Sequence, residues 1–322
     1  MADKKLNEVT FLRVFAIMSL VLWHSYCSYT AWGIGNSPFD HCYRVAFLFI
    51  TPIANMPLFT FLSGYLFFYL LNNKHKYTTF NVFLRNKTNR LLIPYLLLGF
   101  VINLTQIGRG KPLFPMLYGA PNHMWYCLML FNCFMICWVV EKKIGTRYNY
   151  VLAFLSAIFV FLVGNRYLSE HSLWGVWMVA YFYCFFYLGF IFFKYADIIF
   201  PVISKYYLIL IIAFVCTALL STRLNHIAGF SSAIFVILLI SAARRIKNIP
   251  PRWMEIVAKY SFGIYVFHQW IIWNVTRYSP MQSIIQEHYI LFPITLYVCV
   301  FTSSLLLTHL SLKTRLGRYL LT

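Results

Sequence analysis

Long apolar runs recur along almost the whole chain. A helix needs about 20 mostly apolar residues to cross the hydrocarbon core of a bilayer. Ten runs approach this length, at approximately residues 10–31, 45–71, 91–108, 124–140, 149–165, 172–193, 206–222, 227–243, 260–277 and 289–311. They predict an all-α, polytopic membrane protein with about ten transmembrane helices. Because the connections are short and no soluble module separates them, we expect a single membrane domain over residues 1–322.

The composition agrees with this prediction. Hydrophobic residues make up 61% of the chain and charged residues only 11%, whereas about a quarter of the residues of a soluble protein are charged. The first run is too long for the apolar region of a signal peptide and contains Arg13 and His24. We therefore expect it to remain as a membrane helix.

The basic residues predict an orientation. If the N-terminus is cytoplasmic, 20 of the 27 Lys and Arg residues lie in the inner segments and six in the outer loops, with Arg13 inside the first run. Cytoplasmic loops carry this excess in multi-pass proteins. Both termini are thus expected in the cytoplasm, and the protein in the cytoplasmic (inner) cell membrane.

The net charge of +19 needs no nucleic-acid partner. Membrane orientation and attraction to anionic lipid headgroups account for it. A cytoplasmic anionic ligand is the alternative, since residues 72–90 and 244–259 are especially rich in Lys and Arg. The sequence leaves both explanations open.

Most of the eight cysteines lie inside apolar runs and no CxxC motif occurs. Buried free cysteines of this kind usually pack as small hydrophobic residues. We expect no metal site and no permanently bound cofactor.

Ionisable side chains inside membrane spans are costly and usually mark a functional path. Arg13 and His24 are eleven residues apart, which places both on one face of a helix with about 16 Å of rise between them. Arg13 would then lie near the cytoplasmic boundary and His24 beyond the middle of the bilayer. In the alternative interpretation, Arg13 extends to the inner headgroups and His24 bonds a neighbouring helix.

The ninth predicted span carries a polar stripe. Ser261, Tyr265 and His268 follow one another at intervals of four and three residues, so they share one face of an otherwise apolar helix. A structural, packed role for His268 remains the alternative.

Three further motifs stand at the start or middle of spans. Ser63, Gly64 and Tyr65 lie in the second span, where Gly64 allows close helix approach. A basic cluster of Arg85, Lys87 and Arg90 precedes Pro94, which opens the third span. Such a cluster suits phosphate groups. The fourth span begins with His123 and Trp125, and an aromatic residue there also suits the membrane interface.

Taken together, these motifs resemble the acyltransferase-3 family of integral membrane acyltransferases. The resemblance rests on five features in order: Arg13 and His24 with ten residues between them, Phe61 to Tyr65, Arg90 to Pro94, His123 to Trp125, and Ser261 to His268. Each motif is weak alone, but their order on ten spans is specific. The chain is similar to the short form of the family, which has no appended extracytoplasmic domain.

This resemblance implies transfer of an acyl group, usually acetyl, from a cytosolic acyl-CoA to a hydroxyl of an extracytoplasmic or lipid-linked glycan. His24 would act as general base or be acylated itself, and Arg13 would bind a CoA phosphate or stabilise the oxyanion. The nucleotide end would contact Arg85, Lys87 and Arg90. The tunnel and acceptor site would include the following residues: Ser63, Tyr65, His123, Trp125, Ser261, Tyr265 and His268.

Several alternatives stay open. The predicted spans hold almost no carboxylate, so a hydroxyl, an amide or a backbone carbonyl is expected to orient His24. A transporter or flippase for a glycan or lipid would also have many spans, although matching broken helices and midplane carboxylates are not visible. A structural or sensory partner of an envelope complex would need no aligned Arg and His. The acceptor, the acyl group and the oligomeric state are not defined by the sequence.

Overall fold

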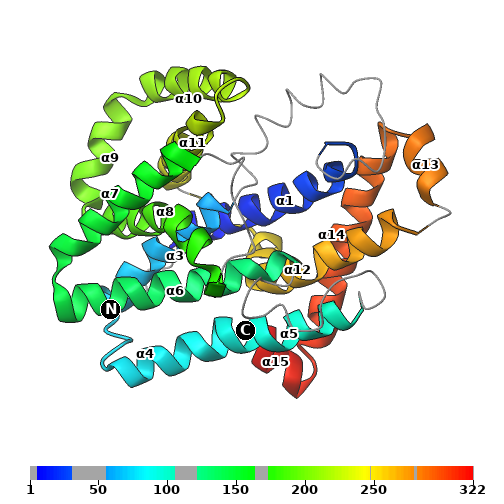
Figure 1. The fold of residues 1–322 in the computed structure, drawn as a ribbon, viewed down its shortest axis with the longest axis horizontal. Helices are drawn as coiled ribbons and strands as arrows, with labels where there is room; N and C mark the ends of the chain where they lie inside the picture. Colours follow the sequence, from blue (N-terminus) through cyan, green and yellow to red (C-terminus); the bar gives the residue numbers. More distant parts are fainter. Residues whose placement is uncertain are drawn as a thin grey trace. The chain divides into compact units, whose positions relative to one another are not determined.

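The computed structural model describes residues 6–30, 56–105, 122–163, 173–246, 248–278 and 281–321, and every regular element in them is a helix (Figure 1). The chain divides into two compact units. Unit 1 contains residues 1–55 and 239–322, and unit 2 contains residues 56–238. Parts of the first, second, third, fifth and sixth predicted spans lie outside the described residues.

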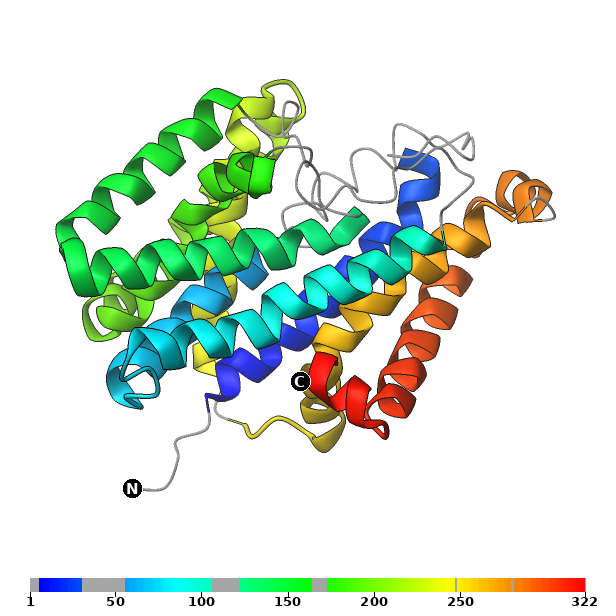
Figure 2. The same ribbon diagram turned by 60° about the horizontal axis from the view of Figure 1, so that its bottom comes forward.

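Unit 1 is built around three long helices, α1 (Asn7–Thr30), α12 (Arg252–Thr276) and α14 (Leu291–Ser311). Each packs against the other two, and both ribbon views show them side by side (Figures 1 and 2). Gly263 allows the close crossing of α12 and α14, because a Cβ atom there would lie 2.3 Å from the Thr308 side chain. Two short helices, α13 (Met281–Glu287) and α15 (Arg315–Leu321), complete the unit.

Unit 2 is centred on the contact between α3 (Pro57–Phe68) and α8 (Val176–Lys194). The two backbones approach so closely that a Cβ on Gly64 would lie 1.8 Å from the Phe186 carbonyl oxygen, and one on Gly189 would lie 1.9 Å from that of Phe61. Small residues allow such approaches in membrane proteins. The close helix approach predicted at Gly64 is therefore confirmed.

Around this pair lie the other helices of unit 2. They are α4 (Phe80–Lys87), α5 (Ile93–Leu104), α6 (Trp125–Val139), α7 (Thr146–Val163), α9 (Ala196–Lys205), α10 (Tyr207–Ser221) and most of α11 (Ala228–Arg245). Single π-helical turns occur at Tyr69–Asn73, Thr88–Leu92 and Val140–Ile144, and 3₁₀ turns at Asn122–Met124, Leu173–Gly175 and Asn225–Ile227. The second π-helical turn joins α4 to α5, and Pro94 stands in the first turn of α5, as predicted.

Helices occur at all ten predicted spans, but not all are long and apolar enough to cross a bilayer by length and composition. Within the part of the chain that the structure describes, five meet both conditions: Asn7–Cys27, Thr146–Val163, Leu173–Lys194, Asn225–Arg245 and Leu291–Ser311. The pair α9 and α10, bent by 76°, would make a sixth if it forms one broken span. That the other helices also cross the bilayer, which would give ten crossings, remains a prediction. Among them, α3 and α5 have only 12 residues each.

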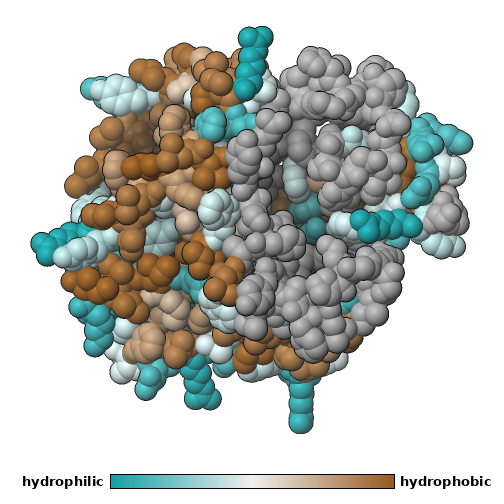
Figure 3. Space-filling model, in the orientation of Figure 1, coloured by the Kyte–Doolittle hydropathy of each residue, from teal (hydrophilic) through white to brown (hydrophobic). Residues whose placement is uncertain are grey.

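Several helices of unit 2 present apolar side chains outward. Phe154 on α7 is 66% exposed and Leu208 on α10 is 70% exposed, and apolar surface covers the side of Figure 3 where α7, α9 and α10 lie. A lipid environment accounts for such exposure, since the hydrocarbon solvates these side chains. The protein is thus a multi-pass membrane protein.

Candidate active site

Helix α1 carries the first candidate residue. His24 is only 7% exposed, and its Nδ1 atom lies 3.0 Å from the carbonyl oxygen of Leu20, one turn earlier. The indole ring of Trp23 meets the imidazole edge to face, with 4.5 Å between ring centroids. The apolar sequence of α1 thus places an imidazole in a buried position within the helix bundle of unit 1.

Helix α12 places a second imidazole beside it. His268 is fully buried, and its Nε2 atom lies 3.2 Å from Nδ1 of His24. The other ring nitrogen of His268 faces two backbone carbonyl oxygens, those of Ile264 at 3.1 Å and Tyr265 at 2.7 Å. The two histidines therefore form a buried, hydrogen-bonded pair between α1 and α12.

The hydrogen-bond partners define the positions of the protons on this pair. A carbonyl oxygen can only accept, so Nδ1 of His268 must carry a proton and, in the neutral ring, Nε2 must be the acceptor. Nδ1 of His24 is then the donor, shared between His268 Nε2 and the Leu20 carbonyl. Both contacts require the same tautomer of His24. Its Nε2 atom consequently bears the basic lone pair.

This arrangement suits proton transfer or nucleophilic attack by Nε2 of His24. If Nε2 takes up a proton or an acyl group, the ring becomes cationic while Nδ1–H keeps its two acceptors. A histidine in this pair has the same orienting role that a carboxylate has in a Ser-His-Asp triad. The sequence predicted that a hydroxyl, an amide or a backbone carbonyl would orient His24, and the Leu20 carbonyl is in that position. The second histidine, His268, was not predicted as a partner of His24.

Of the three residues of the predicted polar stripe on α12, Tyr265 and His268 lie at the histidine pair and Ser261 does not. Tyr265 is buried, with its ring centroid 6.0 Å from that of His268. Ser261 instead donates its hydroxyl to the carbonyl oxygen of Ala258 within its own helix. Arg13 lies three turns before His24 on α1 and is partly exposed.

The family model described as an acyltransferase domain (Acyl_transf_3) matches residues 6–311. The chain belongs to the acyltransferase-3 family. Neither a curated protein nor a solved structure matches it. The matched range includes α1 and α12 and therefore both histidines, so the pair lies within the acyltransferase domain. The protein is a membrane acyltransferase.

The other predicted site residues of this acyltransferase lie in unit 2. On α3, Ser63 donates its hydroxyl to the Phe59 carbonyl, and Tyr65 is buried against the ring of Phe193. His123 is buried in the 3₁₀ turn before α6, and Trp125 contacts the ring of Phe182. Their assignment to the acceptor path stays a prediction.

The three residues of the basic cluster before α5 differ in their exposure. Arg85 and Arg90 are exposed, whereas Lys87 is 7% exposed, and its Nζ atom lies 3.3 Å from the ring centroid of Phe134. The rings of Phe67 and Tyr77 lie 5.6 and 5.3 Å from the same nitrogen. An ammonium group enclosed by aromatic rings is poorly placed to contact a phosphate from the cytosol. Contact of Arg85, Lys87 and Arg90 with the nucleotide stays a prediction, for which the two exposed arginines are the better placed.

A hydrogen-bonded cluster around the Glu141 carboxylate, just after α6, was not predicted from the sequence. Glu141 accepts hydrogen bonds from Asn149, Tyr187 and Thr146 at 2.8–3.0 Å, and Tyr183 donates to the Asn149 side chain. The cluster ties α6, α7 and α8 together. Its sequence signal was weak, because Glu141 stands in a charged segment that looked like an ordinary cytoplasmic loop.

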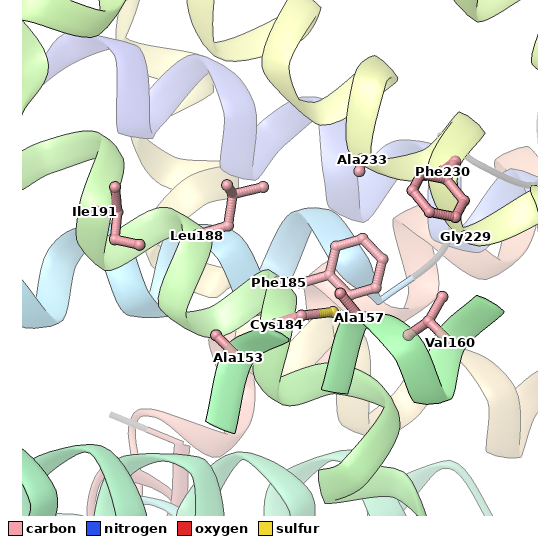
Figure 4. A pocket seen from close by; sticks show the side chains of 10 residues that line it. All are labelled: Ala153, Ala157, Val160, Cys184, Phe185, Leu188, Ile191, Gly229, Phe230 and Ala233. Carbon is pink, nitrogen blue, oxygen red and sulfur yellow. The ribbon is translucent and has the colours of Figure 1, made fainter. Parts of the chain in front are cut away.

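An apolar cavity of about 250 Å³ lies between α7, α8 and α11 (Figure 4). Small residues open it, with Ala153 and Ala157 on α7 facing Gly229 and Ala233 on α11. Cys184 is the most polar residue in its lining. Hydrocarbon chains suit this cavity, which offers no basic or acidic group for acyl transfer.

Proposed function

We propose that the protein transfers an acyl group, most simply acetyl, from a cytosolic acyl-CoA to a hydroxyl of an extracytoplasmic or lipid-linked glycan. The observation that carries this proposal is the buried His24–His268 pair within an acyltransferase-3 domain. A lone pair on Nε2 of His24 is what a reaction between a hydroxyl and a thioester requires.

In the direct route, the acceptor oxygen attacks the thioester carbonyl while Nε2 of His24 removes its proton. The carbon–oxygen bond forms, the carbon–sulfur bond breaks, and the proton passes from His24 to the departing thiolate to give free CoA. General base catalysis of this kind contributes about 10²–10⁴-fold. Nδ1–H of His24 stays bonded to His268 and Leu20 throughout.

In the covalent route, Nε2 of His24 itself attacks the thioester carbonyl. The carbon–nitrogen bond forms as the thiolate leaves, and the acceptor hydroxyl then displaces the imidazole from the acyl group. Both routes use the same lone pair and the same tautomer. Incubation with radiolabelled acetyl-CoA in the absence of acceptor distinguishes them, because only the covalent route leaves label on the protein.

The remaining roles follow the chemistry of the residues. Arg13 provides a permanent positive charge at the predicted cytoplasmic side of α1, where it would contact a donor phosphate or the developing oxyanion. Aromatic residues such as Trp125 offer flat apolar surfaces that suit the faces of a sugar ring.

The decisive experiment combines donor binding with acyl transfer. Acetyl-CoA binding is measured on the purified protein in lipid nanodiscs, and ester-linked acetate is measured on the envelope glycans of cells that express each variant. We expect His24→Ala to abolish the acetate while donor binding persists. Ser25→Ala is the matched control, since Ser25 is also buried on α1 and its hydroxyl donates to the Val21 carbonyl of its own helix.

Two results would contradict the proposal. Full glycan acetylation by His24→Ala would exclude the catalytic role of the histidine. Failure of the wild-type protein to bind acetyl-CoA would instead favour a transporter or a structural partner, because neither needs an acyl donor.

A further inference from the structure

A polar cavity of about 580 Å³ lies in unit 2, between the segment that precedes α4 and the end of α6. The polar, basic and indole groups of its lining belong to His75, Thr78, Thr79, Trp138, Lys142 and Lys143. All belong to segments that the distribution of basic residues predicts on the cytoplasmic side, apart from Trp138 in the last turn of α6. In the predicted orientation the cavity therefore faces the cytoplasm.

Backbone and side-chain hydrogen bonds hold one wall of this cavity in place. The amide of Lys76 donates to the Leu70 carbonyl at 2.9 Å, and the buried Tyr77 donates its hydroxyl to Asn86 at 3.3 Å. His75, immediately before Lys76, adopts a left-handed backbone conformation with φ of 46°, which is uncommon outside glycine. Such a conformation persists only where its surroundings enforce it.

The cavity is cationic without a compensating acid. Neither Lys142 nor Lys143 has an ion-pair partner among the described residues, and no carboxylate lines the space. The nearest acid in sequence, Glu141, is occupied by Asn149, Tyr187 and Thr146 on the side of α7 and α8. Two lysines beside one another thus keep their charge available for an anion.

Two further groups favour an anionic ligand with an aromatic part. Thr79 caps the N-terminus of α4 at this cavity, and exposed backbone amides at a helix N-terminus attract phosphate. Trp138 is 5% exposed, and its indole N–H has no hydrogen-bond partner among the described residues. The ring of Phe80 lies 5.0 Å from that of Trp138 and is partly exposed, which leaves aromatic surface for a base.

We infer that this cavity binds the phosphate groups of a nucleotide, namely the nucleotide end of the acyl-CoA donor. Lys142, Lys143 and the start of α4 contact the phosphates, and the exposed ring of Phe80 contacts the base. The inference rests on the proposed function for the identity of the nucleotide. It places the main phosphate contacts on Lys142 and Lys143 and none on Lys87, whose ammonium is enclosed by aromatic rings.

The test compares binding of CoA and of acetyl-pantetheine, which lacks the nucleotide, to the protein in nanodiscs of neutral lipid. For Lys142→Gln/Lys143→Gln we expect the Kd of CoA to rise about 10- to 100-fold, the loss of two charge-assisted contacts. The KM for acetyl-CoA rises with it while kcat and acetyl-pantetheine turnover stay unchanged. Arg147→Gln/Lys205→Gln is the matched control, which removes two exposed inner charges outside the cavity and leaves CoA binding as in the wild type.

An anionic lipid headgroup carries the same phosphate chemistry, so a second arm uses vesicles containing phosphatidylglycerol. If Lys142→Gln/Lys143→Gln loses vesicle binding but binds CoA like the wild type, the cavity is a headgroup site and the inference fails. Equal CoA and vesicle binding by variant and wild type also overturns it, without affecting the proposed function. Absence of CoA binding in the wild type overturns both.

Discussion

At the scale of single residues, the pair formed by His24 and His268 makes a definite prediction. His268→Phe fills the same space but offers no acceptor to Nδ1–H of His24, so the tautomer with a basic Nε2 is no longer favoured. We expect kcat to fall about 10²–10⁴-fold, as when a triad loses its orienting group, with little change in the KM for acetyl-CoA. Steady-state release of free CoA measures both constants.

The matched variant for that experiment is His268→Gln, whose side-chain oxygen can accept the same hydrogen bond. A positioning role predicts partial recovery of kcat in this variant relative to His268→Phe. Equal loss in both variants, accompanied by a lower thermal midpoint, would assign His268 to packing alone.

Lys87 makes a prediction about stability and pH. Burial lowers the pKa of Lys87 well below its ordinary 10.5, and the nearby charges of Arg90 and Lys76 lower it further. Between the lowered pKa and 10.5 the unfolded chain binds more protons at this residue than the folded chain, so the free energy of unfolding rises with pH across that window. Lys87→Met removes this part of the pH dependence.

Thermal unfolding in detergent between pH 6 and pH 10 measures the effect. We expect Lys87→Met to be more stable than the wild type by about 1–3 kcal/mol near neutral pH, with the difference narrowing as the pH rises. Lys74→Met changes an exposed lysine between α3 and α4 and should follow the wild-type curve. A constant difference at all pH values would show that Lys87 stays charged throughout.

The sequence singled out the two candidate histidines but not the contact between them. His24 and His268 stood out because ionisable groups are rare in apolar spans, but their contact joins residues 244 positions apart. Helical spacing says which residues share a face and nothing about which helix faces it. The same reason explains why the aromatic enclosure of Lys87, made by residues from three segments, was not foreseen.

At the scale of the helices, the crossing of α3 and α8 is the most sensitive point. Gly64→Ala would place its methyl group 1.8 Å from the Phe186 carbonyl oxygen, which belongs to the backbone and cannot rotate away. The helices must then separate, at a cost of about 1–3 kcal/mol. We expect a lower thermal midpoint, and the same for Gly189→Ala.

Ser63→Ala is the control for that pair of variants, because Ser63 is the neighbour of Gly64 on α3, its hydroxyl donates to the Phe59 carbonyl of the same helix, and the change adds no atom to the crossing. A thermal midpoint for Gly64→Ala equal to that of Ser63→Ala would mean that the crossing adjusts without loss.

Helix positions followed from apolar runs, but helix interruptions did not. All ten predicted spans contain a helix, whereas α9 lies in what the sequence analysis assigned to a connection, where Asp197, Pro201 and Lys205 interrupt the apolar pattern. The π-helical turns at residues 69–73, 88–92 and 140–144 also had no signal. Such turns depend on how a side chain fits against a neighbouring helix, and a linear pattern does not contain that information.

At the scale of the whole molecule, the orientation in the membrane is the central prediction. The division of the basic residues into 20 inner and six outer ones predicts an even number of crossings between the two termini. Ten crossings place residues 146 and 248 and the C-terminus in the cytoplasm and residue 223 outside.

Fusions of a fluorescent protein and of alkaline phosphatase after each of these positions measure this directly, since the former fluoresces only in the cytoplasm and the latter is active only outside. We expect fluorescence after residues 146, 248 and 322 and phosphatase activity after residue 223. Phosphatase activity at the C-terminus would require an odd number of crossings, and fluorescence after residue 223 would mean that α10 does not cross the bilayer.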